Sequence, residues 1–319
     1  MSDDWITVRL AEKRRVAEDV VGLALEPADG ATLPPFTAGA HVDIELPGGL
    51  VRQYSLCNAP GASGRYELGI LLDRQGRGGS RAVHETLAAG QSVRISPPRN
   101  LFPLRPAEHV VLMAGGIGIT PILAMAEQLA HERASFELHY FVRAPERAAY
   151  LDRLGEPRFF GRWRLHVGER IPSSFDTAAI FGTPHEGHRL YVCGPNAFMD
   201  FVLDGARAGG WPEERLHSER FAAAATSGAG DRPFEIEVEG RGLVVPVAVG
   251  QSAAEALAAA GIRIPLSCEQ GICGTCLTTV VEGVPDHRDS YLSDQERAAN
   301  DCFTPCCSRA ATPRLVIQL

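Results

Sequence analysis

The sequence has little that would direct the chain to a membrane or to nucleic acid. No apolar run approaches the roughly 18 residues that a transmembrane helix needs. The opening segment, MSDDWITVRLAEKRR, lacks the apolar core of a signal peptide. Basic residues are the minority, because 31 Lys and Arg stand against 39 Asp and Glu, and the net charge is −8. We therefore expect a soluble, cytoplasmic protein with neither a membrane nor a nucleic-acid partner.

The sequence also lacks the residue patterns of several enzyme classes. It contains no order of Ser, His and Asp typical of a catalytic triad and no histidine pair with metal-ligand spacing. His41 and His84 stand near motifs described below, and we expect each to be a structural hydrogen-bonding residue. No repeat and no low-complexity tract is present.

Three segments have different patterns, which predicts a multidomain protein. Residues 1–104 hold short β-type runs, such as HVDIEL and YELGILL, and are predicted to form an antiparallel β-barrel. Residues 105–225 alternate strands and helices, the pattern of an α/β parallel-sheet domain. Residues 226–319 begin with a predicted hairpin, form an α+β module and carry −5 of the net charge. The small-residue segment AAAATSGAGD, 222–231, is the predicted linker.

The last segment contains six of the eight cysteines. Cys268, Cys273 and Cys276 follow a C-x4-C-x2-C pattern, with Gly271 and Gly274 between them. Thiolates are soft ligands for iron–sulfur clusters, zinc or copper, and glycines let backbone N–H groups turn toward the sulfurs. With a distant fourth cysteine, this spacing is that of a plant-type [2Fe–2S] site. Structural zinc usually shows two separate C-x2-C pairs, and no second pair is present.

The spacing leaves the fourth ligand open, because Cys302, Cys306 and Cys307 all follow the loop. Residues 265–319 resemble a plant-type ferredoxin domain, whose last ligand lies in a C-x-S-R context at about the distance between Cys276 and Cys306. The resemblance implies a β-grasp fold, selects Cys306 and leaves the other two as spare thiols. The predicted iron ligands are Cys268, Cys273, Cys276 and Cys306.

A glycine turn, MAGGIGITP at 113–121, follows a predicted strand and opens a helix. Helix N-terminal amides suit a pyrophosphate, but Pro121 replaces the third glycine of the usual fingerprint, and tight strand–helix packing could also explain the turn. Together with YVCGPNAFM, the turn resembles the pyridine-nucleotide domain of the ferredoxin–NADP reductase superfamily. The resemblance places Cys193 beside the nicotinamide as a catalytic residue, although a lone cysteine is commonly a small buried hydrophobe. The implied nucleotide-binding residues are Gly115, Gly116, Gly118, Thr120, Cys193, Gly194 and Pro195.

The choice between NADH and NADPH rests on the segment FVRAPERAAY. It contains Arg143 and Arg147 but no acidic residue at the strand end. Two arginines could hold a 2′-phosphate or could form ordinary surface ion pairs. Resemblance to the oxygenase-reductase branch favours NADH.

Two motifs in the first segment suit an anionic ligand. Arg52 in RQYSLCN can grip a phosphate by bidentate hydrogen bonds. The Gly-Gly-Ser turn in GRGGSRAVHE, 76–85, can add amides and a hydroxyl. Taken singly, the first also fits a solvated strand residue and the second a mobile loop.

In this order, R-x-Y-S, G-G-S and G-G-x-G-x-T-P resemble the flavin reductases of the phthalate dioxygenase reductase type, over essentially the whole chain. This family joins an FMN barrel, an NAD domain and a C-terminal plant-type ferredoxin, and its members imply a monomer. The resemblance implies that Arg52 and Ser80 bind the FMN phosphate. It also implies that Tyr54 packs on the isoalloxazine and that Ser55 lies near N5 as a catalytic residue. The implied flavin-binding residues are Arg52, Tyr54, Ser55, Gly78, Gly79 and Ser80.

These parts belong together because NADH gives two electrons as a hydride, whereas a [2Fe–2S] cluster takes one at a time, and a flavin can do both. The predicted function is the NADH-dependent reductase component of a Rieske non-haem iron oxygenase system. The partner oxygenase would act on an aromatic acid, an O-methyl ether or a quaternary amine. The alternatives are a reductase for a haem protein or a free ferredoxin, a cluster-based redox sensor without turnover, and a zinc-stapled interaction module.

Overall fold

The structure is a computed structural model that describes residues 5–61, 64–168, 180–181, 184–221 and 230–319. The chain folds into two compact units, Met1–Phe221 and Ala222–Leu319. Most of the predicted linker, residues 222–229, lies outside the described residues. The boundary expected near residue 104 stays a prediction. In the described part of the chain, no helix has the length and apolarity needed to cross a membrane.

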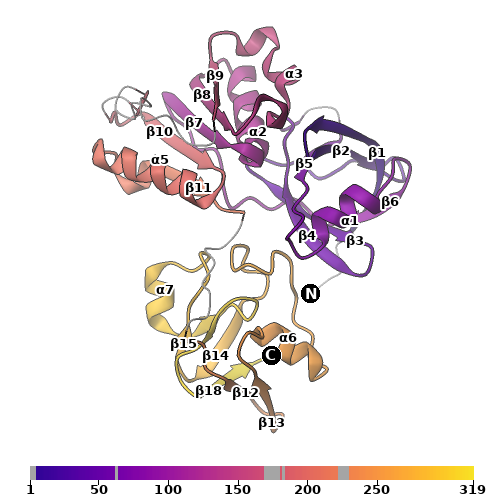
Figure 1. The fold of residues 1–319 in the computed structure, drawn as a ribbon, viewed down its shortest axis with the longest axis vertical. Coiled ribbons are helices and arrows are strands. Elements are labelled where there is room, and N and C mark those ends of the chain that lie inside the picture. Colours follow the sequence, from indigo (N-terminus) through magenta and orange to yellow (C-terminus); the bar gives the residue numbers. More distant parts are fainter. Residues whose placement is uncertain (1–4, 62–63, 169–179, 182–183, 222–229) are drawn as a thin grey trace. The chain divides into compact units, whose positions relative to one another are not determined.

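The first sheet of the N-terminal unit is antiparallel, with the strand order β4-β3-β6-β1-β2-β5 (Figure 1). An isolated bridge between Leu56 and Leu68 joins the two edges of this sheet, so that it closes into a barrel. Val8, Leu10 and the inward-facing side chains of the other strands fill the barrel interior. Helix α1 (Gly79–Thr86) follows strand β5 in the chain. The strands are β1 (Ile6–Ala17), β2 (Val20–Pro27), β3 (His41–Leu46), β4 (Leu50–Ser55), β5 (Tyr66–Leu71) and β6 (Ser92–Ile95).

The second sheet is parallel throughout, with the order β11-β10-β7-β8-β9 (Figure 1). Its strands are β7 (His109–Gly115), β8 (Ser135–Val142), β9 (Trp163–Val167), β10 (His188–Cys193) and β11 (Leu216–Glu219). Its helices are α2 (Ile119–His131), α3 (Leu151–Leu154) and α5 (Asn196–Ala208), and its 3₁₀ turns are η1 (Gly116–Gly118), η2 (Pro145–Arg147), η3 (Pro157–Phe159) and η4 (Glu213–Arg215).

Successive residues of β7 enter different cores, because side chains alternate along a strand. Leu112 packs in the core that includes α2, and Val111 and Met113 pack in the core that includes α5. Both faces of the sheet are therefore covered, as a parallel sheet requires. The carboxyl ends of its strands, where ligands bind in open α/β sheets, remain at one edge.

The C-terminal unit is built on a mixed sheet, with the order β13-β12-β18-β14-β16. β12 pairs antiparallel with β13, which confirms the predicted hairpin, and parallel with β18. Both helices begin with a capping box, in which a serine and a glutamate three residues later satisfy each other's backbone N–H. The elements are β12 (Phe234–Val238), β13 (Leu243–Val247), α6 (Ala253–Ala259), β14 (Thr278–Glu282), β15 (Pro285–Asp286), α7 (Asp294–Ala299), β16 (Cys302–Phe303), β17 (Arg309–Ala310) and β18 (Arg314–Gln318).

The predicted fold class is confirmed. An antiparallel barrel, a parallel-sheet α/β part and a mixed-sheet ferredoxin module follow one another along the chain. The strand predicted from HVDIEL has the same bounds in the structure, and the helix predicted to follow the glycine turn MAGGIGITP is α2.

Candidate functional site

The cysteine loop lies between α6 and β14 and brings four sulfurs together. Cys306 reaches this loop from the turn after β16 and is hydrogen-bonded to Cys268, to Cys276 and to the adjacent Cys307. Cys268 is also hydrogen-bonded to Cys273. Of the three cysteines that the spacing left open, Cys302 lies in β16 opposite Thr279. The structure thus groups the four predicted ligands, whose assignment to iron stays a prediction.

The donor set of this loop fits a [2Fe–2S] cluster. The backbone N–H groups of Gln270 and Ile272 each donate to Cys268 Sγ at 3.4 Å, an arrangement that stabilises a thiolate. Hydrogen bonds from Cys273 and Cys306 lower the pKa of the Cys268 thiol, and a bond from Cys306 lowers the pKa of Cys276. Within the part of the chain that the structure describes, no three His, Cys, Asp or Glu side chains form a single-ion site. Cys268 contacts both Cys273 and Cys306, and Cys306 also contacts Cys276, so the four predicted ligands form one connected group of sulfurs.

Two glycines shape the loop. Gly271 and Gly274 have φ values of +71° and +69°, which side chains rarely adopt. A Cβ at Gly271 would overlap Cys307 Sγ, and a Cβ at Gly274 would overlap the ring of Tyr291. Both positions therefore need glycine for conformation and for space.

The flavin motifs meet where β4 runs beside the start of α1. Arg52 packs on Gly79 so closely that a Cβ there would overlap the arginine side chain. The Arg52 guanidinium donates to the carbonyl of Arg77 at 3.2 Å, just before the helix. The first turn of α1 contains no acidic residue, and its N–H groups have no partner within the helix. The Arg52 guanidinium and the N–H groups at the start of α1 therefore lie side by side, and only glycine at position 79 leaves room for both. This arrangement fits a phosphate group.

Two other predicted flavin residues have defined environments. Tyr54 lies against the barrel core, and burial raises its pKa to about 12, so that its hydroxyl stays neutral. Ser80 uses its hydroxyl to accept from the backbone N–H of Asp73 at 3.0 Å and to donate to the Asp73 carbonyl at 3.4 Å. Its backbone N–H, rather than its hydroxyl, is therefore the group best placed for an anion. Gly78 precedes the helix with φ at +82°.

The nucleotide motifs pack directly against each other at the carboxyl edge of the parallel sheet. A Cβ at Gly118 would overlap the Cys193 carbonyl, and one at Gly194 would lie 2.9 Å from Gly115 Cα. Thr120 is buried and donates its hydroxyl to Ile117 O at 3.1 Å. Pro121 occupies the first turn of α2, where its missing N–H costs nothing. The remaining predicted residues of this site, Gly116 and Pro195, stand at the starts of η1 and α5.

Ser55, Cys193 and Glu219 converge between the barrel and the parallel sheet. Ser55 ends β4, and its hydroxyl donates to Glu219 Oε2 at 3.4 Å. Cys193 and Glu219 are register partners at the ends of β10 and β11. Burial raises the pKa of Glu219 to about 8, against the lowering effect of the Ser55 bond. Burial, followed by the nearby Glu219, holds the pKa of the Cys193 thiol well above its usual range. Cys193 is therefore a buried neutral thiol, and Glu219 is the group that titrates near neutral pH.

Glu219 was missed by sequence reasoning. It ends the four-residue strand LHSE, which has no motif and too few residues for a periodic signal. The parallel pairing of β10 with β11 alone brings it beside Cys193. An acidic residue at the carboxyl end of the last parallel strand is the one signal that could have indicated it.

The two arginines considered for a 2′-phosphate are separated by their contacts. Arg147 pairs with Glu18 at 3.0 Å and with Asp19 at 3.7 Å, both at the β1–β2 turn. Arg143 follows β8 and is exposed, and it takes part in none of the ion pairs found among the described residues. At most one arginine of the pair is therefore directed at a nucleotide.

Known proteins share both the pattern and the fold. A family profile for the 2Fe-2S iron-sulfur cluster binding domain matches residues 236–311. The chain is 51% identical to a vanillate O-demethylase oxidoreductase of Pseudomonas sp. (strain HR199 / DSM 7063), over 98% of this chain and 100% of that protein. It is 38% identical to the phthalate dioxygenase reductase of Burkholderia cepacia, over 99% and 98% of the two chains.

Two solved structures are similar over nearly the whole chain. Phthalate dioxygenase reductase, described as a modular structure for electron transfer from pyridine nucleotides to [2Fe-2S], superposes with a TM-score of 0.81 at 38% identity, covering 99% of this chain and 98% of that one. An intact type IV self-sufficient cytochrome P450 monooxygenase gives a TM-score of 0.79 at 36% identity, covering 99% of this chain and 41% of that one.

These likenesses extend over both units and include the cysteine loop. The chain is an oxidoreductase that holds a [2Fe–2S] cluster and a flavin and draws electrons from a pyridine nucleotide. It belongs to the phthalate dioxygenase reductase-like family, whose members carry a C-terminal plant-type ferredoxin domain.

Proposed function

We propose that the chain is the NADH-dependent, FMN-containing reductase of a Rieske non-haem iron oxygenase that O-demethylates an aromatic methyl ether such as vanillate. The observation that carries the redox part is the meeting of Ser55 with Glu219 beside Cys193. This contact supports the proposal, because it brings the end of β4 to the carboxyl end of the parallel sheet, where the nicotinamide would bind. The substrate class is supported by 51% and 50% identity to two vanillate O-demethylase oxidoreductases.

The chain's own residues bind and orient the cofactors. Arg52 and the N–H groups of Gly79 and Ser80 hold the FMN phosphate, and Tyr54 covers one face of the ring. When bound, the flavin accepts two electrons together and releases them singly. Ser55 links the flavin edge to Glu219, which can hold or release a proton at Oε2 near neutral pH because burial raises its pKa to about 8.

The nucleotide residues position the nicotinamide and exclude water. The Gly115–Gly118 turn approaches the pyrophosphate with backbone alone. A Cβ at Gly115 would collide with Phe198 of α5, and a Cβ at Gly118 would collide with the Cys193 carbonyl. The buried Cys193, the half-buried Gly194 and the exposed Pro195 form one wall of the nicotinamide pocket. The predicted ligands Cys268, Cys273, Cys276 and Cys306 hold the cluster, which carries one electron at a time.

NADH is proposed as the donor, because Arg147 is occupied by Glu18 and Asp19. The kcat/KM for NADH should exceed that for NADPH, and Arg143→Ala should change this ratio little. A large loss of NADPH turnover in that variant, with NADPH preferred by the wild type, would show that Arg143 binds a 2′-phosphate.

Reconstitution tests the function as a whole. The purified chain should show flavin bands and a broad sulfide-to-iron absorption that NADH bleaches. With a vanillate-demethylating oxygenase component it should support one formaldehyde per NADH, as the balance of O₂, methyl ether and NADH requires. Equal or faster transfer to a haem protein or a free ferredoxin would replace the proposed acceptor. Absence of NADH oxidation with every acceptor would favour a redox sensor.

A further inference from the structure

One arginine joins the barrel to the parallel-sheet part of the N-terminal unit through three partners. Arg153, on α3, donates from Nη2 to the carbonyl of Cys57 at 2.9 Å and from Nη1 to Glu67 Oε2 at 3.2 Å. Its Nε donates to Glu127 Oε1 at 2.8 Å. Cys57 and Glu67 belong to the barrel, whereas Glu127 lies on α2. We call Arg153, Glu127, Glu67 and the Cys57 carbonyl the Arg153 clamp.

The clamp lies close to both proposed reaction partners along the chain. Cys57 stands two residues after Ser55, at the end of the flavin strand. Glu127 lies on the helix that the nucleotide turn opens, and its Oε2 accepts from the N–H of Ala59 at 2.8 Å. A rigid connection at Cys57 and Ala59 therefore fixes where the flavin strand ends relative to α2.

Tyr150, just before α3, adds a second link. Its hydroxyl donates to Leu68 O at 3.1 Å and accepts from Cys57 Sγ at 3.5 Å. A Cβ at Gly69 would lie 2.7 Å from that hydroxyl and 2.8 Å from Thr120 Cγ2. Strand β5 thus contacts Thr120, a predicted nucleotide-binding residue, so closely that the strand has no space to shift against it.

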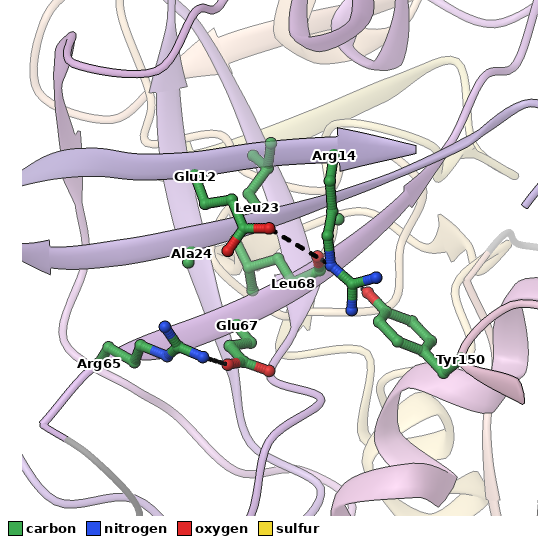
Figure 2. Close-up of a pocket in the computed structure, with 9 residues that line it drawn as sticks. Glu12, Arg14, Leu23, Ala24, Arg65, Glu67, Leu68 and Tyr150 are labelled. Atoms are coloured by element: carbon green, nitrogen blue, oxygen red, sulfur yellow. Dashed lines mark hydrogen bonds and ion pairs between the residues drawn. The ribbon is translucent and has the colours of Figure 1, made fainter. Parts of the chain in front are cut away.

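Apolar packing does not complete this junction. A cavity of about 130 Å³ opens beside the clamp, lined by β1, β2 and β5 residues and by Tyr150 (Figure 2). The charged side chains there are paired, Arg65 with Glu67 at 2.6 Å and Arg14 with Glu12 at 3.5 Å, so the cavity presents no free charge to a ligand. Arg153 and Glu127, in contrast, have side chains only 12% and 4% exposed. Directional polar contacts therefore add to the apolar core that Val20 and Cys57 share with α2 and Tyr150, and they fix the register here.

We propose that Arg153 is a positioning residue for hydride transfer, which holds the Ser55 end of the flavin strand at a fixed distance from the Cys193 turn. The inference rests on the proposed function, because it assumes flavin at Ser55 and nicotinamide at Cys193. Reacting atoms must be held near 3–3.5 Å, and a displacement of about 1 Å by a distant change can cost on the order of 100-fold in rate. A guanidinium can hold three partners in one plane, which an ammonium cannot reproduce.

The test compares full-length holoprotein variants. Arg153→Lys keeps the positive charge beside Glu127 and Glu67 but removes the planar guanidinium that holds three partners at once. The double variant Arg153→Met/Glu127→Gln also removes the guanidinium. Because position 127 is then a neutral amide, no unpaired charge is left buried. Arg162→Met is the matched control, because Arg162 also donates to a backbone carbonyl, that of Ala134, but joins two segments of the parallel-sheet part only.

Stopped-flow absorbance at saturating NADH gives the limiting rate of flavin reduction and the long-wavelength charge-transfer band. Both clamp variants should reduce flavin at least about tenfold more slowly and show a weaker band, with FMN and NADH dissociation constants within about threefold of wild type. The control should match wild type. Wild-type rates and band in Arg153→Lys would overturn the proposal, whether or not the double variant folds. A wild type that NADH does not reduce would instead refute the proposed function.

Discussion

At the scale of single residues, burial decides which side chains can do chemistry. Cys193 and Glu219 are neighbours across β10 and β11, where burial raises the pKa of the thiol well above its usual range and brings that of the carboxyl to about 8. Desolvation disfavours the charged form of both groups. Because the ordinary pKa of a carboxyl is much lower than that of a thiol, an upward shift brings only the pKa of Glu219 close to neutral pH.

Glu219→Gln should change the pH dependence of flavin reduction. The wild-type limiting rate should show a step near pH 8, and the variant should lack it, because an amide does not titrate. Stopped-flow rates between about pH 6 and 9 measure this. A step that persists in the variant would assign the titration to another group.

The same residue should affect stability in a defined window. The folded pKa of about 8 lies above the ordinary value of 4.5, so the folded state keeps a proton that the unfolded state loses between these values. The free energy of unfolding contributed by Glu219 therefore falls as pH rises through this window and levels off above about 8. In urea unfolding, the free energy of unfolding of Glu219→Gln should rise relative to that of wild type between about pH 5 and 8. A constant difference would contradict the shift.

Cys306→Ser and Cys307→Ser separate two adjacent thiols. The first should abolish the visible and electron-paramagnetic signals of the cluster and spare flavin reduction, because Cys306 contacts both Cys268 and Cys276. The second should keep both signals, since Cys307 contacts one predicted ligand, Cys306, and otherwise bonds to Thr304 Oγ1 at 3.2 Å. Iron and sulfide content provide the check. Cluster loss in the Cys307 variant alone would reverse the ligand choice.

At the scale of elements, helix α1 is fixed at both ends by side chains from other strands. Arg52 of β4 packs on Gly79 at its start. Lys13 of β1, the only lysine in the chain, donates from Nζ to the carbonyls of Val83, His84 and Leu87 at 2.7–2.9 Å. A tetrahedral ammonium suits three separate acceptors at a helix C-terminus, where positive charge is favourable.

Gly79→Ala should weaken FMN binding about tenfold, equivalent to roughly 1.4 kcal/mol, because the new methyl displaces Arg52 from the phosphate cradle. Fluorescence titration of the apoprotein with FMN measures it. Gly209→Ala, at the end of α5 with its nearest atom at 3.3 Å, is the control for the substitution itself. Equal FMN affinity in both variants would remove the phosphate assignment.

Lys13→Met should lower the free energy of unfolding by about 1–3 kcal/mol, since buried carbonyls lose a charged donor. Lys13→Arg should not restore it, because a planar guanidinium cannot reach the three carbonyls together. Chemical denaturation followed by circular dichroism gives the values. Arg9→Met, which breaks the exposed pair with Glu26, should cost about 0–1 kcal/mol. Equal costs at the two positions would argue against a special role for Lys13.

At the scale of the whole molecule, charge is divided unevenly between the two units. The C-terminal segment from residue 231 carries −5 of the net −8, and the predicted cluster ligands lie within it. Surplus charge of one sign speeds encounter with an oppositely charged partner surface, and salt screens it. An acidic surface kept for solubility would give no such dependence.

Electron delivery to the oxygenase should therefore fall as ionic strength rises from about 0.05 to 0.5 M. Flavin reduction by NADH, which the proposed function assigns to the N-terminal unit, should change little over the same range. Steady-state turnover and stopped-flow reduction measured side by side distinguish the two steps. Salt-independent turnover with the oxygenase would favour the solubility explanation.

Much of the candidate site could be predicted because short-range patterns encode it. The C-x4-C-x2-C loop and the GGIGITP turn need particular residues at fixed spacings, so they are visible without coordinates. Glu219 and Arg153 could not be predicted, because each acts through partners distant in the sequence: Ser55 for the first, Cys57 and Glu67 for the second.

The sequence by itself determined the order of the barrel, parallel-sheet and ferredoxin parts and the thiolate character of the cysteine loop, since hydrophobic periodicity and cysteine spacing are local properties of the chain. Resemblance to a known family, rather than any local pattern, implied the flavin and the nucleotide. Tertiary structure alone decided which groups face the reaction. Parallel register set Glu219 beside Cys193, burial moved its pKa, and Arg153 joined the barrel to α2. These outcomes depend on pairing and desolvation across long sequence separations, which no local pattern specifies.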